Sequence, residues 1–409
     1  MGDGVEFALA AIDAQIAALD ARYRLVGKGT GDEFFAVFRV AYDEILASVE
    51  DVRARWATSA DDPKALRVFE RSLERKLTEL RLHDALVTEF AEDVGRQDLP
   101  VGFMMLIDKV CSDLLDASSD HLVHVSNEYD YSTSRVGGGL IVNLPAVDPA
   151  NAMWAPILVH EIAHSVFGKV KDEYNSALKG LADELGDLRS RNPAENAEDD
   201  AAREDLLSDW GEELFCDAVA TIVTGPSFLF ALSSRLVGAT WKLEQRHPPP
   251  SVRLQLVLAI LERHGWGDVL RTSVPGVMTW AELVASEEPE TEDVIVGFLC
   301  AGARLLFPVI DQLAAARVPQ PFGPNPSADR AREAGEYFEK DLLPVEISRS
   351  PHIEWEFLLA AWLLELTRQD GKPTSLPSIP FDKQLNGLLI KTMELSRIVE
   401  LWGQIDVAG

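Results

Sequence analysis

The sequence is poor in cysteine and in basic residues. Its 409 residues include three cysteines, Cys111, Cys216 and Cys300, which are odd in number and far apart. This usage argues against a disulfide framework and is typical of a reducing compartment. The 38 Lys and Arg residues are outnumbered by 67 Asp and Glu, for a formal net charge of −29. Because nucleic acids and anionic membrane surfaces are bound by clustered positive charge, we expect neither as a partner.

Long hydrophobic runs are also absent. No stretch of 18 uncharged apolar residues occurs, and the nearest candidates, 222–241 and 294–316, are both interrupted by charged residues. We therefore expect no membrane span. The first residues lack a basic segment followed by an apolar core, so we expect no signal peptide and a cytoplasmic location. The chain also has no internal repeat, no glycine-rich phosphate loop and no nucleophile elbow.

Apolar residues recur at helical spacing in most of the chain, whereas short alternating stretches at 121–126 and 140–144 predict two strands. The predicted fold class is therefore mainly α with a small β-sheet (α+β). We expect three regions: an N-terminal helical region at 1–98, a core at 99–265 and a C-terminal helical region at 266–409.

The most informative stretch is the His-Glu-x-x-His sequence formed by His160, Glu161 and His164. Residues four apart lie on the same face of a helix, so both imidazoles can point at one metal ion. Glu161 is one position further round, where it can reach a water on that metal. Two histidines that hold zinc and a glutamate that serves as base are the metalloprotease arrangement.

A plainer interpretation of this motif is a buried helix whose histidines bond to nearby carbonyls. The residues around the motif are apolar on almost every side, which predicts a buried helix. Titratable side chains in such a helix need partners, and a metal ion would be one.

A second stretch places Glu213 and Asp217 four residues apart in another apolar segment. Two buried carboxylates on one face are costly unless compensated. A zinc ion would satisfy Glu213 as the third ligand, and Asp217 would bond the second ring nitrogen of a zinc-bound histidine. Glu212 competes for the ligand role but lies off the face of Asp217. A salt-bridged helix face is the alternative.

A third stretch, His247-Pro-Pro-Pro followed by Arg253, opens a helix after a stiff turn. A histidine held there can enter a cleft and stabilise an oxyanion, and the arginine can pair with a carboxylate of the site.

The order of these three stretches resembles the gluzincin metallopeptidases and is most similar to M48-type peptidases. The resemblance covers about 137–263. It implies a zincin-like metalloprotease core, with His160, His164 and Glu213 as zinc ligands and Glu161 as the catalytic base. It also implies Asp217 as the carboxylate behind the ligands, with His247 and Arg253 in the cleft. Many M48 members have membrane spans that this sequence lacks, and the Glu-x-x-x-Asp-x-x-Ala pattern also resembles soluble peptidases that cut bacterial repressors.

The predicted function is zinc-dependent hydrolysis of peptide bonds, with Zn²⁺ as cofactor and a peptide or protein as substrate. Substrates of proteases are often held as an added strand, and we expect residues 139–144 to offer a sheet edge for this purpose. An ordinary hairpin is the alternative for that segment. The alternative function is a latent or inactive metal-binding regulatory protein whose flanking helices bind a partner.

Overall fold

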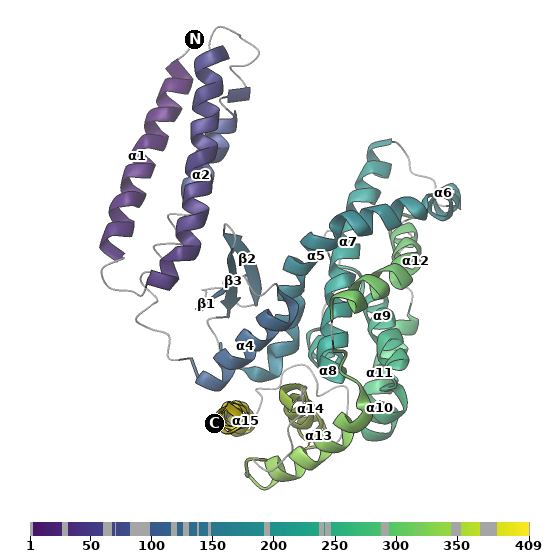
Figure 1. Cartoon of the computed structure of the whole chain (residues 1–409). Helices are drawn as coiled ribbons and strands as arrows, with labels where there is room; N and C mark the ends of the chain where they lie inside the picture. The colour runs from purple at the N-terminus through teal and green to yellow at the C-terminus, as the bar shows by residue number, and fades with distance from the viewer. Residues whose placement is uncertain are drawn as a thin grey trace. The chain divides into compact units, whose positions relative to one another are not determined.

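The protein is described from a computed structural model of the full chain. The residues that the structure describes are 3–26, 32–59, 68–69, 71–81, 99–115, 121–125, 131–136, 139–145, 149–191, 197–236, 241, 247–287, 294–318, 320–344, 353–368 and 383–408. Most of them are helical, and the strands form one small sheet (Figure 1), as the predicted fold class requires.

The chain divides into two compact units rather than the three expected regions. Residues 1–98 and 117–149 form unit 1, whereas residues 99–116 and 150–409 form unit 2. The segments 99–265 and 266–409 therefore do not separate, and the sheet belongs with the N-terminal helices. The division follows from contacts between distant segments, which periodicity along the sequence does not report.

Unit 1 contains α1 (Asp3–Val26) and α2 (Asp32–Ser59), which lie side by side, with further helical residues at 71–81. The buried residues of its helical core are seven apart within each helix, a spacing of about two turns. They are Val5, Ile12, Leu19, Tyr42, Val49, Leu73 and Leu80. The hydroxyl of Tyr42 donates a hydrogen bond to the Ile16 carbonyl (3.2 Å), so the buried phenol is satisfied.

The sheet has three strands, β1 (His121–Val125), β2 (Ser132–Val136) and β3 (Gly139–Leu144). Their order is β1-β3-β2, with β3 parallel to β1 and antiparallel to β2. The two predicted strands are confirmed. The strand β2 escaped prediction because Ser-Thr-Ser-Arg-Val carries little apolar alternation.

The expectation that residues 139–144 present a free sheet edge is wrong. β3 is the central strand, and its backbone groups on both sides are already paired with β1 and β2. Its apolar run reflects this position, since Leu140, Ile141, Val142 and Leu144 are all buried.

Unit 2 is built from helices, one of them a short 3₁₀ turn. In chain order they are α4 (Val101–Leu114), η1 (Ala152–Trp154), α5 (Ala155–Gly180), α6 (Ala182–Arg191), α7 (Ala197–Thr224), α8 (Pro226–Leu236), α9 (Pro250–Arg263), α10 (Gly267–Ser273), α11 (Pro275–Ser286), α12 (Val294–Arg317), α13 (Pro324–Glu339), α14 (Ile353–Arg368) and α15 (Lys383–Ala408).

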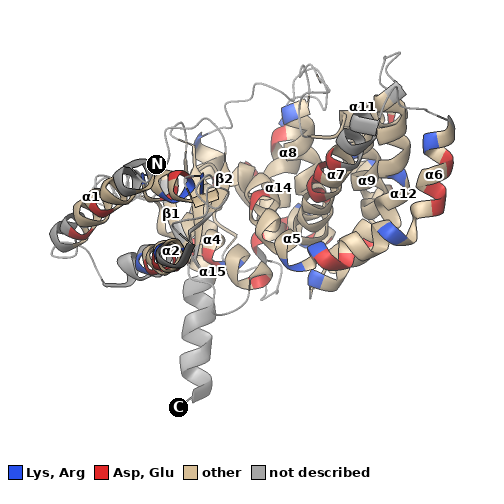
Figure 2. Cartoon of the chain, turned by 90° about the horizontal axis from the view of Figure 1, so that it is seen from above, with Lys and Arg blue, Asp and Glu red and all other residues tan. Residues whose placement is uncertain are grey.

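The helix α7 is central to unit 2, because it packs against α5, α8, α9 and α12. Asp and Glu recur along α6 and α7, coloured red in Figure 2. These two acidic helices also contribute to the core of unit 2. Leu185 of α6 and Leu207 of α7 are buried, and both lie near Gly302 of α12.

The helix α12 is long and apolar enough to cross a membrane by length and composition alone, over Ile295–Arg317. Within unit 2 it packs against α5, α7 and α9, and Phe298, Leu306 and Ile310 are buried. In this packing, 44% of its most apolar 18-residue window is buried.

The C-terminal helices hold the turn that precedes α5. Asn386 of α15 accepts a hydrogen bond from the Ala152 amide (2.9 Å) and donates one to the Ala150 carbonyl (3.1 Å). The indole of Trp362 in α14 donates to the Met153 carbonyl (3.2 Å). The start of α5 is therefore set by residues more than 200 positions later in the sequence.

The contact between α4 and α15 predicts a stability effect. A Cβ at Gly102 would overlap the Ile390 carbonyl of α15. Because backbone cannot yield as a flexible side chain does, we expect Gly102→Ala to lower the free energy of unfolding by about 1–3 kcal/mol, measured by urea denaturation.

Gly387→Ala, in the partner helix α15, is the control, since nothing lies within 4 Å of a Cβ there. Replacing this exposed helical glycine should stabilise the protein by up to about 1 kcal/mol. Equal effects of the two substitutions would contradict the predicted close contact at Gly102.

Candidate metal centre

The helix α5 begins at Ala155, with a proline in its first turn where no backbone hydrogen bond is lost. His160 and His164 lie on one face of it, one turn apart. His160 is buried and His164 is partly exposed. Their ring centroids are 5.2 Å apart with the planes nearly perpendicular. The expected juxtaposition of the two imidazoles is therefore present.

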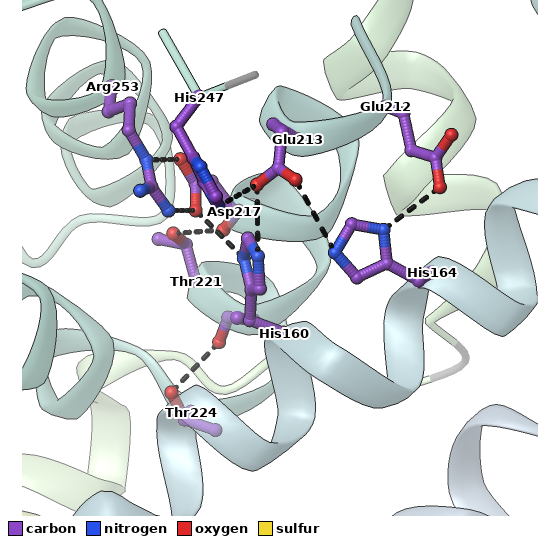
Figure 3. A network of polar contacts seen from close by, with 10 residues as sticks. His160, His164, Glu212, Glu213, Asp217, Thr221, Thr224, His247 and Arg253 are labelled. Atoms are coloured by element: carbon purple, nitrogen blue, oxygen red, sulfur yellow. Dashed lines mark hydrogen bonds and ion pairs between the residues drawn. The ribbon is translucent and has the colours of Figure 1, made fainter. Parts of the chain in front are cut away.

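The helix α7 packs against α5 and places Glu213 opposite both histidines (Figure 3). Its Oε2 lies 3.3 Å from His160 Nε2, and its Oε1 lies 3.7 Å from His164 Nε2. One ligand atom from each of the three residues lies within 4.8 Å of the others. Ligands about 2.0–2.2 Å from a tetrahedral metal are separated by roughly 3.3–3.6 Å, so this group could hold a metal ion.

Each histidine has a second carboxylate at its other ring nitrogen. Asp217 Oδ1 lies 2.9 Å from His160 Nδ1, and Glu212 Oε1 lies 2.9 Å from His164 Nδ1. The first pair is close, but its geometry is not that of a straight hydrogen bond. Both imidazoles are thereby turned with Nε2 towards Glu213, the orientation that carboxylates behind metal ligands provide.

The two adjacent glutamates of α7 therefore differ in position. Glu213 faces both Nε2 atoms, whereas Glu212 lies behind His164 and is absent from the group of converging ligand atoms. The sequence left Glu212 as a competitor for the ligand role. Consecutive residues point about 100° apart on a helix, and only the packing of α5 on α7 decides which one faces the histidines.

Arg253 of α9 forms a bidentate pair with Asp217, with Nε 2.7 Å from Oδ2 and Nη2 2.6 Å from Oδ1. Both residues are buried. Burial alone would raise the pKa of Asp217, but the charge and hydrogen bonds of Arg253 hold this pKa at about 2. Asp217 is therefore ionised and close to His160 Nδ1, and Arg253 pairs with a carboxylate of the site as expected.

The remaining charges depend on one another. Burial lowers the pKa of His160, but the nearby carboxylates of Asp217 and Glu213 outweigh it and raise the pKa to about 9. Burial alone would raise the pKa of Glu213, but the hydrogen bond and charge of His160 lower this pKa to about 2. Without a metal, the cluster is stabilised by a protonated imidazole between two carboxylates.

Glu161 follows His160 on α5 and is partly exposed. Burial, as the largest influence, raises the pKa of its carboxyl above the ordinary value. Glu161 therefore binds a proton more strongly than an exposed glutamate would.

His247 is more exposed than the other site residues, yet its Nε2 lies 3.4 Å from Glu213 Oε2. The structure therefore brings His247 to the same carboxylate as the two helical histidines (Figure 3). Phe228 of α8 stacks on His160, with the two rings nearly parallel and their centroids 6.1 Å apart. No sequence motif distinguished Phe228 from other apolar residues of its helix.

Comparisons with protein-family models, with curated proteins and with solved structures found no match. The geometry of His160, His164 and Glu213 is therefore the evidence that a metal could bind here.

The assignment of Glu213 as ligand makes a prediction about metal content. We expect purified wild-type protein to hold about one zinc per chain and Glu213→Ala to lose it, because two imidazoles alone make an incomplete site. Elemental analysis of both proteins measures this.

Glu212→Gln is the matched comparison. It should still bind zinc, with affinity about 10–100-fold lower, because only the partner of His164 Nδ1 is altered. Loss of zinc in Glu212→Gln with retention in Glu213→Ala would reverse the assignment.

The raised pKa of His160 predicts that zinc binding releases a proton. Near pH 7.5 this imidazole is protonated in the metal-free protein, and only its neutral form can bind a metal. We expect release of about one proton per zinc, obtained from calorimetry in buffers of different protonation enthalpy. The release should diminish above pH 9, and a value of zero at pH 7.5 would contradict the prediction.

Proposed function

We propose that this protein is a zinc-dependent peptidase of gluzincin type, in which a glutamate base activates the attacking water. The observation that supports this best is the convergence of two imidazole Nε2 atoms and one carboxylate beside Glu161. Catalytic zinc sites characteristically have three protein ligands of this kind and one open position, whereas structural sites have four.

The donor set fits zinc in chemistry as well as spacing. Glu213 Oε2 is buried, and its contacts with His160 Nε2 (3.3 Å) and His247 Nε2 (3.4 Å) are longer than ordinary hydrogen bonds. A metal ion between these atoms would compensate the buried oxygen more fully. His160, His164 and Glu213 would hold the ion. Zinc, when bound, lowers the pKa of water towards about 7 and polarises a substrate carbonyl.

Glu161 is the proposed catalytic base. It precedes the ligand His164 by three residues and follows His160 directly, so its carboxylate adjoins the metal position without being one of the three ligands. Glu161 takes a proton from the attacking water and delivers it to the leaving amine.

His247 is proposed to stabilise the substrate oxyanion. Its exposed ring lies within reach of the site, and a donor at Nε2 can shift from Glu213 to the carbonyl oxygen as negative charge develops there. Asp217 and Arg253 are proposed to orient His160, because their buried ion pair lies against its Nδ1.

The proposed substrate is a peptide or protein bound in extended form. The alternative is a latent or inactive metal-binding protein that regulates or binds a partner. The presence of Glu161 favours the enzyme, because a purely structural metal site needs no base.

The proposed role of Glu161 predicts a separation of binding from turnover. Glu161→Gln should retain zinc but lose at least about 100-fold in kcat, because the amide cannot accept the proton. Hydrolysis of a fluorogenic peptide library by the zinc-loaded protein measures turnover, and elemental analysis measures the metal.

Glu184→Gln, the same substitution at an exposed position of α6, should leave turnover unchanged. Normal cleavage by Glu161→Gln would refute the assigned role. Zinc binding by the wild type without cleavage of any library peptide would favour the alternative function.

A further inference from the structure

His247 is linked to α7 by contacts of two other residues, Trp241 and Arg253. Six residues before it, the indole Nε1 of Trp241 donates a hydrogen bond to the His247 carbonyl (3.0 Å). The ring of Trp241 also packs edge-on against Trp210, with centroids 6.2 Å apart. Trp210 is a fully buried residue of α7, three positions before Glu213. The backbone of His247 is therefore linked to α7 through two tryptophans.

The second attachment lies six residues after His247. Arg253 is joined to Asp217 of α7 by its bidentate pair. Trp210 and Asp217 lie on either side of Glu213 along α7, and Glu213 is the residue that His247 Nε2 approaches at 3.4 Å. The two attachments thus flank, along the same helix, the carboxylate that His247 faces.

An exposed imidazole can occupy many orientations unless neighbouring contacts fix its backbone. The His247 side chain is 55% exposed, so little packing surrounds the ring itself. Catalytic groups contribute fully only when held near their productive geometry, usually by hydrogen bonds from neighbouring residues. The indole N–H of Trp241 acts on the backbone of His247 directly.

From these contacts we infer that Trp241 is a positioning residue. It holds His247 beside the metal centre by donating a hydrogen bond to the His247 carbonyl while its ring packs against Trp210. Its effect on turnover rests on the proposed peptidase function, whereas its effect on His247 itself does not. Trp241 touches none of the proposed metal ligands in the contacts of the described residues, and no motif in the sequence singled it out.

The test uses Trp241→Phe, which keeps an aromatic ring against Trp210 but removes the indole donor. In zinc-loaded protein, we expect carbethoxylation of His247 by diethyl pyrocarbonate, followed by peptide mass mapping, to be several-fold faster than in the wild type. The modification rate of His264, which lies at the end of α9, should not change. An unchanged rate at His247 would overturn the inference, whether or not the protein is an enzyme.

Trp266→Phe is the matched control, because it also removes an indole hydrogen bond to a backbone carbonyl, that of Phe322 (2.7 Å). This substitution should leave the modification rate of His247 unchanged in protein confirmed as folded by circular dichroism. An equal acceleration in Trp266→Phe would show general loosening and would overturn the positioning role.

Turnover supplies the second measurement. If the wild type cleaves peptides, Trp241→Phe should lower kcat roughly threefold to tenfold, the effect of one ordinary hydrogen bond, with zinc content unchanged. The same change made in His247→Ala should have no further effect. Additive losses would mean that Trp241 does not act through His247. A wild type without peptidase activity would refute the proposed function, and the modification rates would still decide the role of Trp241.

Discussion

The structure of unit 2 depends on the compensation of two carboxylates buried in α7. Glu213 and Asp217 lie one turn apart in a helix packed on several sides by apolar residues, and ionised groups in such surroundings are unstable without partners. Arg253 neutralises Asp217 from α9, and His160 lies close to both from α5. Three helices are therefore held in one arrangement by a single charge network, and that arrangement is also what brings the candidate ligands together.

The two sides of the site differ in burial. On the inner side, the Asp217–Arg253 pair is buried, and Phe228 stacks on His160. On the outer side, His164, Glu212 and His247 are partly or largely exposed. A catalytic metal site combines buried groups that orient its ligands with an exposed side that substrate and water can reach. The candidate site has both features.

The three motifs predicted most of the candidate site. The four-residue spacings of His160 with His164 and of Glu213 with Asp217 are properties of helices, so they could be inferred without tertiary information. The contribution of Arg253 was also predictable, because a buried carboxylate needs a cation. Glu212, Phe228 and Trp241 differ. Glu212 was named only as a rival ligand, and the other two were not singled out, because their positions depend on how α5, α8 and Trp241 pack against α7 and the site.

By itself, the sequence determined the helical character of the chain, two of the three strands in its described part and the residues able to bind a metal, because periodicity and side-chain chemistry are local properties. Tertiary structure alone decided that Gly139–Leu144 is the central strand, that the sheet belongs with the N-terminal helices, and that Asn386 and Trp362 secure the start of α5. These features arise from contacts between residues far apart in the chain, where many pairings satisfy the same apolar pattern and only the packed structure selects one.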